Sequence, residues 1–511
     1  MTTHHTGPEP GRPGSWDEII VGAGSSGATL AALLARDPHR TVLLLEAGPP
    51  DPTGPGETPV LEGANWPYTA YLDHTRPHPR TYPYPLGRTL GGSSAVNGAL
   101  ALRALPHDFH HWTQPDNNTW AWENVLTSYK ALENDNHPTH EHNTTGPLPI
   151  HRTPPHHLSP LAQAFLTTCA TLGLPPTQDL NSTTSPTGAG PLPMNTTNGN
   201  RISTAHAHLT NPPPNLHIRT NTTVARILTH AGHATGVQLL DGTHLTAGHV
   251  TLSAGAINTP TLLMRSGIGP ANHLTTHGIH PIADLPGVGQ NLTDHPITAL
   301  WAIPTPGTCH PGEPTHQVLA RTTTGPHHPD LNITLINNLN NLPIPGITHI
   351  LAGRDAIALH ATLLTPHSRG HVTLRDANPT TPPHIDLALL TNPHDTQRLT
   401  TGIQLIWQLT QQHPLATHLH HILLWTPHII ENPHLLHRTL THTTTPAWHP
   451  TGTATMGPTT NPNTVVDHHL NVHQLTNLSI VDASIIPTPP SAPTNLTCIM
   501  LAHHAATWMR Q

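Results

Sequence analysis

A glycine-rich turn between a short apolar strand and an apolar helix, near the start of the sequence, restricts the possible folds more than any other feature. The segment DEIIVGAG (17–24) is a β-branched strand that closes on glycines, SSGATLAALLAR (25–36) has helical periodicity, and TVLLLEAG (41–48) is a second apolar strand. These segments form a βαβ unit of about 30 residues, the length typical of a dinucleotide-binding start. The sequence therefore predicts an α/β fold that begins with a Rossmann-like domain.

The glycines in this turn have the spacing G-x-G-x-x-G, from Gly22 to Gly27. Gly22 permits the tight turn, Gly24 lets backbone N–H groups approach a pyrophosphate, and Gly27 lets the helix pack closely on the strand. The N-terminus of the helix then faces the negative phosphates. Glu46 ends the second strand about 20 residues further on, where an acid accepts hydrogen bonds from the adenosine ribose. Its carboxylate would repel a 2′-phosphate, which argues against NADP.

A second segment of small residues, GRTLGGSSAVNG, spans 87–98. Its glycines and serines allow the backbone to press against a flat or charged ligand. A plain surface loop is the alternative, but a loop of this composition without acidic residues suits contact with a phosphate or a ring. We therefore predict a second cofactor contact in this segment.

Length and composition exclude several other classes of protein. A chain of 511 residues is too long for one compact core, so two domains are expected. Charged residues make up 9% and the net charge is −8, which provides no basic surface for nucleic acid or membranes. No apolar run approaches the roughly 18 residues of a membrane-spanning helix, and the cysteines lack CxxC spacing. Residues 1–14 do not resemble a signal peptide and are expected to form a disordered leader, so a cytoplasmic location is predicted.

Histidine is unusually frequent, because the chain has 49 histidines but a single lysine, Lys130. Metal binding or pH sensing is one interpretation of this composition. The other is a coding bias that places histidine wherever surface chemistry tolerates it. We favour the bias because the histidines are scattered rather than set at zinc-ligand spacing. No metal site is predicted from the sequence.

Four further motifs follow in order along the chain: SAGAINTPTLLMRSGIGP (253–270), DLPGVGQNLTDHP (284–296), HPTGTATMGP (449–458) and VDASIIPTPPSAPTN (481–495). Together with the N-terminal βαβ unit and the 87–98 segment, they resemble the signatures of the glucose–methanol–choline (GMC) family of FAD-dependent oxidoreductases. The likeness runs from about residue 16 to the end of the chain.

The resemblance implies a two-domain fold. A Rossmann-like FAD-binding domain would be assembled from 15–150, 201–297 and 442–511, and a discontinuous α+β substrate-binding domain from 151–200 and 298–441, with its sheet above the flavin. The active site would lie at the junction of the two domains.

The resemblance also implies which residues contact FAD. Val224 would meet the adenine through its backbone, and Asp482 would lie near the pyrophosphate or the ribityl chain. Some family members bind the flavin covalently through a histidine at the position of Val96, so FAD is expected to be noncovalent here. The full set of expected contacts is Gly22, Gly24, Ser26, Gly27, Glu46, Ala47, Arg88, Gly92, Ser93, Asn97, Gly98, Val224, Asp482, Ala483, Thr494 and Asn495.

His449 is the residue that the resemblance places at the chemistry. In the family, the histidine of the HPxGTxxMG pattern takes the proton of the alcohol as hydride leaves for the flavin. An imidazole suits this task, since its unperturbed pKa near 6.5 keeps it a competent base at neutral pH. The alternative is that His449 is one of many biased histidines, but its place beside Pro450, Gly452 and Met456 argues against that.

Pro493 departs from the family pattern, which has His or Asn at this position as a second group on the substrate hydroxyl. Proline has no side-chain donor or acceptor. Asn495 or Thr494 could fill in by a local shift, other contacts could hold the hydroxyl, or the protein could perform different chemistry.

The leading prediction is oxidation of a small-molecule alcohol to a carbonyl, with reoxidation of the flavin by oxygen or another electron acceptor. The alternative is a non-oxidising lyase or isomerising tailoring enzyme of natural-product biosynthesis on the same scaffold. A flavin-binding protein without catalysis is a third interpretation. The sequence carries no signal for the substrate or the oligomeric state.

Overall fold

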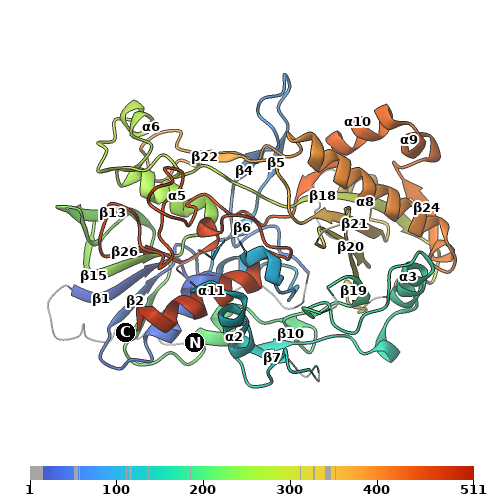
Figure 1. The fold of residues 1–511 in the computed structure, drawn as a ribbon, viewed down its shortest axis with the longest axis horizontal. Coiled ribbons are helices and arrows are strands. Elements are labelled where there is room, and N and C mark those ends of the chain that lie inside the picture. Colours follow the sequence, from blue (N-terminus) through green and yellow to red (C-terminus); the bar gives the residue numbers. More distant parts are fainter. Residues whose placement is uncertain are drawn as a thin grey trace.

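The computed structural model describes residues 15–50, 56, 58–110, 112–113, 118–135, 137, 139–184, 186–310, 312–325, 328–339, 347–351 and 353–510. The leader predicted over 1–14 lies outside this range. Two seven-stranded sheets form the two halves of the molecule, and the C-terminal helix lies beside the first of them (Figure 1). In the described part of the chain, no helix has the length and apolar character needed to cross a bilayer.

The first sheet is built around parallel strands, as the βαβ pattern predicts. Its central strand β1 pairs in parallel with β2 on one side and with β15 on the other. All four residues of β2 are buried, which is typical of a parallel strand covered on both faces. The strand order is β12 (Leu216–Arg219), β2 (Val42–Leu45), β1 (Ser15–Val21), β15 (His244–Leu252), β14 (His233–Leu239) and β13 (Val224–His230), with β26 (Leu478–Ile480) on β15.

Helices from both ends of the chain pack beside this sheet. Helix α1 (Ser25–Leu34) contacts α11 (Thr494–Met509), which in turn contacts α2 (Trp122–Leu132). The residue pattern predicts a helix over 25–36, another over 120–135 and a third from Thr494 to Met509, and the structure has a helix at each place. Helix α11 begins at Thr494, directly after Pro493 at its N-cap. Proline is tolerated there because the first helical N–H groups have no intrahelical partner.

The second sheet is antiparallel and has its own apolar core, which includes Leu300, Leu331 and Leu359. Helix α8 (Pro393–Gln411) packs on it through its buried face, together with α3 (Pro160–Thr171). The strand order is β24 (Leu419–Leu423), β18 (Pro296–Pro304), β21 (Ile357–Leu363), β20 (Leu331–Ile336), β19 (His316–Thr322) and β9 (Gly188–Pro191), with β25 (Thr445–Pro446) on β18.

A four-stranded sheet lies between the two halves (Figure 1). It joins β4 (Thr69–Tyr71) and β5 (Thr81–Pro83) to β22 (His371–Thr373) and β23 (His384–Asp386). The Pro- and Gly-rich composition of residues 49–86 predicts a loop excursion, yet the described part of this segment contributes β4 and β5 to the sheet. The strands are only three residues long, so no periodicity identified them. This sheet also joins segments that the sequence assigns to different domains.

The remaining helices and strands are short apart from α5 and α10. They are β3 (Asn65–Trp66), β6 (Leu86–Gly87), β7 (Glu133–Asp135), β8 (Leu148–Ile150), β10 (Thr196–Thr197), β11 (Asn200–Arg201), α4 (Thr204–Leu209), α5 (Gly255–Arg265), β16 (Ile268–Gly269), α6 (Ala271–Thr276), β17 (Ala283–Asp284), α7 (Thr348–Leu351), α9 (Pro427–Glu431) and α10 (Pro433–Thr443).

Candidate active site

A cavity of about 480 Å³ brings together the motifs from the two ends of the chain. Its volume falls in the usual range of small-molecule and cofactor sites, roughly 300–1,000 Å³. All but one of the residues that the sequence predicts for the site line it. They are Gly22, Gly24, Ser26, Glu46, Ala47, Arg88, Gly92, Ser93, Asn97, Gly98, Val224, His449, Asp482, Ala483, Thr494 and Asn495.

Gly27 is the exception, because it lies beneath the turn rather than in the cavity wall. A Cβ atom on Gly27 would lie 1.9 Å from the carbonyl oxygen of Gly22. Gly22 itself has φ +99°, and a Cβ there would lie 2.5 Å from the carbonyl oxygen of Ser253. Glycine is therefore needed at both positions for α1 to start directly against β1.

The two glycine-rich segments touch each other at the cavity wall. Gly92 has φ +52°, and a Cβ atom on it would lie 2.7 Å from the Cα of Gly24. The backbone N–H of Gly91 donates to the carbonyl of Ala23 at 2.8 Å. Bare backbone from both segments therefore faces the same space, which is the cradle that a pyrophosphate requires.

Arg88 adds a positive charge to this wall. Its guanidinium lies 4.8 Å from the ring centroid of Trp66, and both residues line the cavity. Among the described residues, its buried Nε atom has no hydrogen-bond partner. A buried guanidinium donor without an acceptor fits an anionic ligand such as a phosphate.

Glu46 sits at the end of β2, where the sequence predicts a ribose contact. One carboxylate oxygen accepts from the N–H of Ala23 at 3.0 Å and the other from the N–H of Gly48 at 2.8 Å. Burial raises the pKa of Glu46 above its ordinary value, and these backbone donors oppose the rise. Each oxygen keeps a lone pair that could accept from a ribose hydroxyl.

Asp482 caps the start of α5. Its carboxylate accepts from the N–H of Gly255 at 2.9 Å, from the hydroxyl of Thr259 at 2.5 Å and from the N–H of Ser484 at 2.8 Å. Burial raises its pKa, and these donors act in the opposite direction. Asp482 therefore holds the N-terminal end of α5 at the cavity wall.

His449 is anchored by the two residues of an Asp-His pair in the 284–296 motif. The backbone N–H of His449 donates to Asp294 Oδ1 at 3.0 Å, and the Tyr84 hydroxyl bonds the other oxygen of Asp294. The side chains meet directly, with His295 Nδ1 3.0 Å from His449 Nδ1. Burial raises the pKa of Asp294 to about 7.

Both rings of this histidine pair favour the neutral form. Burial lowers the pKa of His295 to about 4. Burial and the neighbouring His295 lower the pKa of His449 well below its ordinary value. Between two neutral rings, one Nδ1 donates and the other accepts. If His449 donates, its Nε2 atom carries a free lone pair and can accept a proton.

Sequence reasoning missed His295 and Asp294, although both lie in a motif used for the resemblance. Nothing in DLPGVGQNLTDHP states that its Asp-His pair meets a histidine 154 residues later. The one local signal that could have identified Asp294 and His295 is an acid followed directly by a histidine at the end of a glycine-rich segment.

Asn495 and Pro493 line the same cavity as His449, on the N-terminal end of α11. The side-chain oxygen of Asn495 accepts from the hydroxyl of Ser25 at 2.7 Å, which ties α11 to the start of α1. Asn495 thus bonds the glycine-rich turn in this structure. Pro493 offers no side-chain polar atom to the cavity.

Comparisons with known proteins agree with this architecture. Two family profiles, both described as GMC oxidoreductase, match residues 16–297 and 366–502. The chain is 32% identical to the 5-(hydroxymethyl)furfural oxidase of Methylovorus sp. over 96% of this chain and 98% of that protein. It is 32% identical to mouse mitochondrial choline dehydrogenase over 96% and 88% of the two chains. The crystal structure of pyridoxine 4-oxidase from Mesorbium loti superposes with a TM-score of 0.86 at 29% identity, covering 97% and 99% of the two chains.

Proposed function

The chain belongs to the GMC oxidoreductase family, and from this premise we propose that it is an FAD-dependent enzyme that oxidises a small alcohol to a carbonyl compound, with His449 as the base. The relatives named above are called after 5-(hydroxymethyl)furfural, choline and pyridoxine, which all carry hydroxyl groups. The observation that carries the proposal is the place of the half-buried His449 imidazole, whose pKa is lowered, in the wall of the same cavity as the glycine cradle.

The cavity residues fit FAD. The backbone of Gly22, Gly24 and Gly92 would hold the pyrophosphate with Arg88, and Glu46 would accept from the ribose. Bound there, FAD would supply the acceptor for the hydride that leaves the alcohol carbon. Oxygen or another electron acceptor would reoxidise the flavin. A cytoplasmic location stays a prediction from the sequence.

His449 would take the hydroxyl proton of the alcohol on Nε2. Its lowered pKa keeps the ring unprotonated at neutral pH and below, so the base is available without a prior deprotonation step. His295 holds the Nδ1 side of the ring and so orients Nε2. With Pro493 in the wall, the hydroxyl is held by His449 without a second side chain at that position. We assign Asn495 to the cofactor side, since its amide bonds Ser25.

Anaerobic mixing of the purified protein with a panel of primary and secondary alcohols tests this proposal. Oxidation of an alcohol transfers two electrons to the cofactor, so the absorption band of the oxidised flavin should bleach without added reductant. Aryl and furanyl alcohols, choline and pyridoxine are the first choices, after the relatives. If product forms while the band stays unchanged, the non-oxidising lyase or isomerase is the correct alternative.

FAD should be released by acid. Val96 occupies the position from which some family members bind flavin through a histidine, and valine has no nucleophilic atom. Precipitation with trichloroacetic acid is therefore expected to leave a white pellet and a yellow supernatant. A pellet that stays yellow after washing would show a covalent bond and refute the prediction.

Replacing His295 by phenylalanine should lower kcat by about 10²-fold, the size of effect that a misplaced catalytic group produces. Phenylalanine fills the same space but cannot bond Nδ1 of His449, so the ring loses its fixed tautomer and orientation. Stopped-flow measurement gives the limiting rate constant of flavin reduction, which should fall by the same factor, separately from the apparent Kd for the alcohol. His295→Gln keeps a hydrogen-bonding side chain and should retain more of the rate. Equal loss in both variants, or a change in Kd alone, would contradict the role assigned to His295.

A further inference from the structure

Three histidines from distant parts of the chain meet on one face of the small sheet. In β22 and β23, residues alternate between the two faces. Val372 and Ile385 are fully buried in the apolar cluster beneath the sheet. Their neighbours His371 and His384 point to the other face, as does Asp386, which lies directly opposite His371 in the strand register.

His74 completes the group from the segment that follows β4. One ring nitrogen from each of His74, His371 and His384 lies within 4.8 Å of the others. The ring centroids are 5.5 Å apart for His74 and His371, and 5.7 Å apart for each of the other two pairs. Small side-chain rotations would bring three nitrogen atoms to one point.

Asp386 orients the His74 ring. Its carboxylate bonds His74 Nδ1 through the side chain and accepts from the backbone N–H of His74 at 3.3 Å. This leaves Nε2 of His74 for a ligand, in the arrangement of carboxylate, histidine and metal that recurs in zinc sites. The carboxylate also supplies a negative charge beside the three rings.

The rings are accessible and available as ligands. The His74 side chain is 42% exposed, so an ion can reach the cluster from solvent. His371 and His384 are partly buried beside it, on the strands of the small sheet.

We propose that His74, His371 and His384 bind one Zn²⁺ ion, with water as the fourth ligand and Asp386 as the hydrogen-bond partner of His74. Three imidazoles and a water satisfy the tetrahedral preference of zinc. The ion links β4 to the hairpin of β22 and β23, whose connecting residues 379–383 line the cofactor cavity. Its role is to fix this hairpin against the rest of the cavity wall, independently of the alcohol chemistry.

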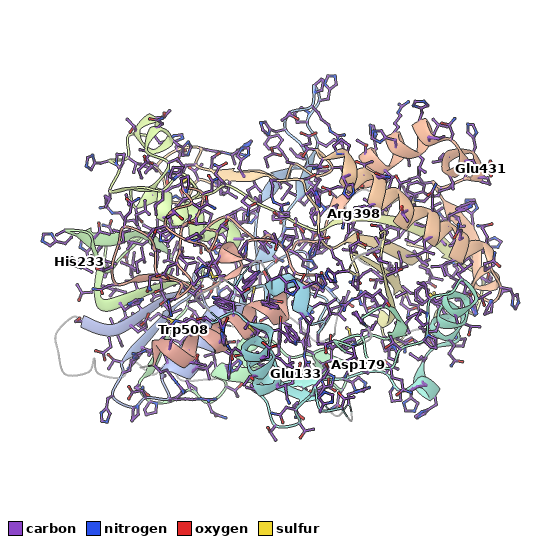
Figure 2. All side chains as sticks on the ribbon, in the orientation of Figure 1. Glu133, Asp179, His233, Arg398, Glu431 and Trp508 are labelled. Atoms are coloured by element: carbon purple, nitrogen blue, oxygen red, sulfur yellow. The ribbon has the colours of Figure 1, made fainter. Side chains whose placement is uncertain are left out.

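A second cluster of potential metal ligands, around His142, differs because arginine side chains already occupy it. His142 lies among the carboxylates of Glu133, Asp135 and Asp179, and Glu133 and Asp179 lie near each other in Figure 2. Two guanidinium groups already occupy that cluster, since Arg103 pairs with Glu133 and Arg152 with Asp135 and Asp179. The carboxylates around His142 therefore need no further cation. The three rings on the small sheet have one carboxylate beside them, and among the described residues no arginine forms an ion pair with it.

Zinc titration of the full-length protein tests the proposal. Protein treated with EDTA and then freed of chelator is titrated with Zn²⁺ by calorimetry, and the bound metal is counted after desalting. One tight site per chain is expected, together with a rise in Tm on adding Zn²⁺, because a ligand that binds only the native state stabilises it. His384→Ala should abolish the tight site, and Asp386→Asn should weaken it about 10–100-fold.

His74→Ala provides a second variant in case His384→Ala fails to fold, since His74 is exposed and lies outside the strands. The matched control is His394→Ala, which removes one ring of the exposed pair His367 and His394, 5.1 Å apart. The control should bind zinc as the original protein does. Weak binding alone in the original protein, or an unchanged tight site in His74→Ala, would overturn the proposal.

Discussion

The His449→Ala protein is expected to reduce its flavin about 10²–10⁴-fold more slowly than the original enzyme, the usual contribution of a general base. The imidazole is the only group that the 449–458 motif offers to the alcohol proton. Pro493, which lines the same cavity, has no acceptor side chain to take over. Stopped-flow spectroscopy under anaerobic conditions, at saturating alcohol, measures this step alone.

FAD content should stay close to one per chain in this variant. The residues expected to hold the dinucleotide lie on other elements, and the backbone N–H of residue 449 still donates to Asp294. His449→Gln keeps a side-chain partner for His295 and should be as slow as His449→Ala, since an amide is not a base at neutral pH. His437→Ala, which removes an exposed histidine of α10, should react normally. A His449→Ala rate within a few-fold of the original would exclude the proposed base.

Gly22→Ala should yield protein without FAD. At φ +99° an alanine is strained by about 1–3 kcal/mol. In addition, its Cβ would lie 2.5 Å from the carbonyl oxygen of Ser253, a backbone atom that cannot rotate away. The turn between β1 and α1 must therefore open, which removes the N–H groups expected to hold the pyrophosphate. The ratio of flavin to protein absorbance after purification, with the Tm, measures the effect.

Gly278→Ala separates strain from steric conflict. Gly278 also has a positive φ, +70°, but a Cβ there meets nothing within 4 Å. This variant should lose about 1–2 kcal/mol of stability from the left-handed backbone alone and keep its FAD. If Gly22→Ala binds FAD as tightly as Gly278→Ala does, the glycine turn does not hold the cofactor.

The parts of the site that the sequence determined are local. Gly22, Gly24 and Glu46 lie within one βαβ unit, where the spacing of glycines and the length of the strands prescribe a turn, a helix start and a strand end. The helix after Pro493 is equally local, because proline and the apolar pattern fix where it begins. Such features depend on φ, on periodicity and on neighbours a few residues away.

Contacts between distant segments were decided only by the tertiary structure. The pairing of His449 with His295 spans 154 residues. Of the three clustered histidines, His371 and His384 come from strands too short to show a period, and His74 lies in the segment after β4. In the sequence, the only criterion for a metal site was the spacing of ligands along the chain. The scattered histidines do not meet that criterion, so no metal site was predicted. Strand pairing and domain packing bring residues together at no fixed spacing along the chain. The backbone path of the cofactor cradle therefore followed from the sequence. The contact of His295 with His449 and the histidine cluster on the small sheet followed only from the fold.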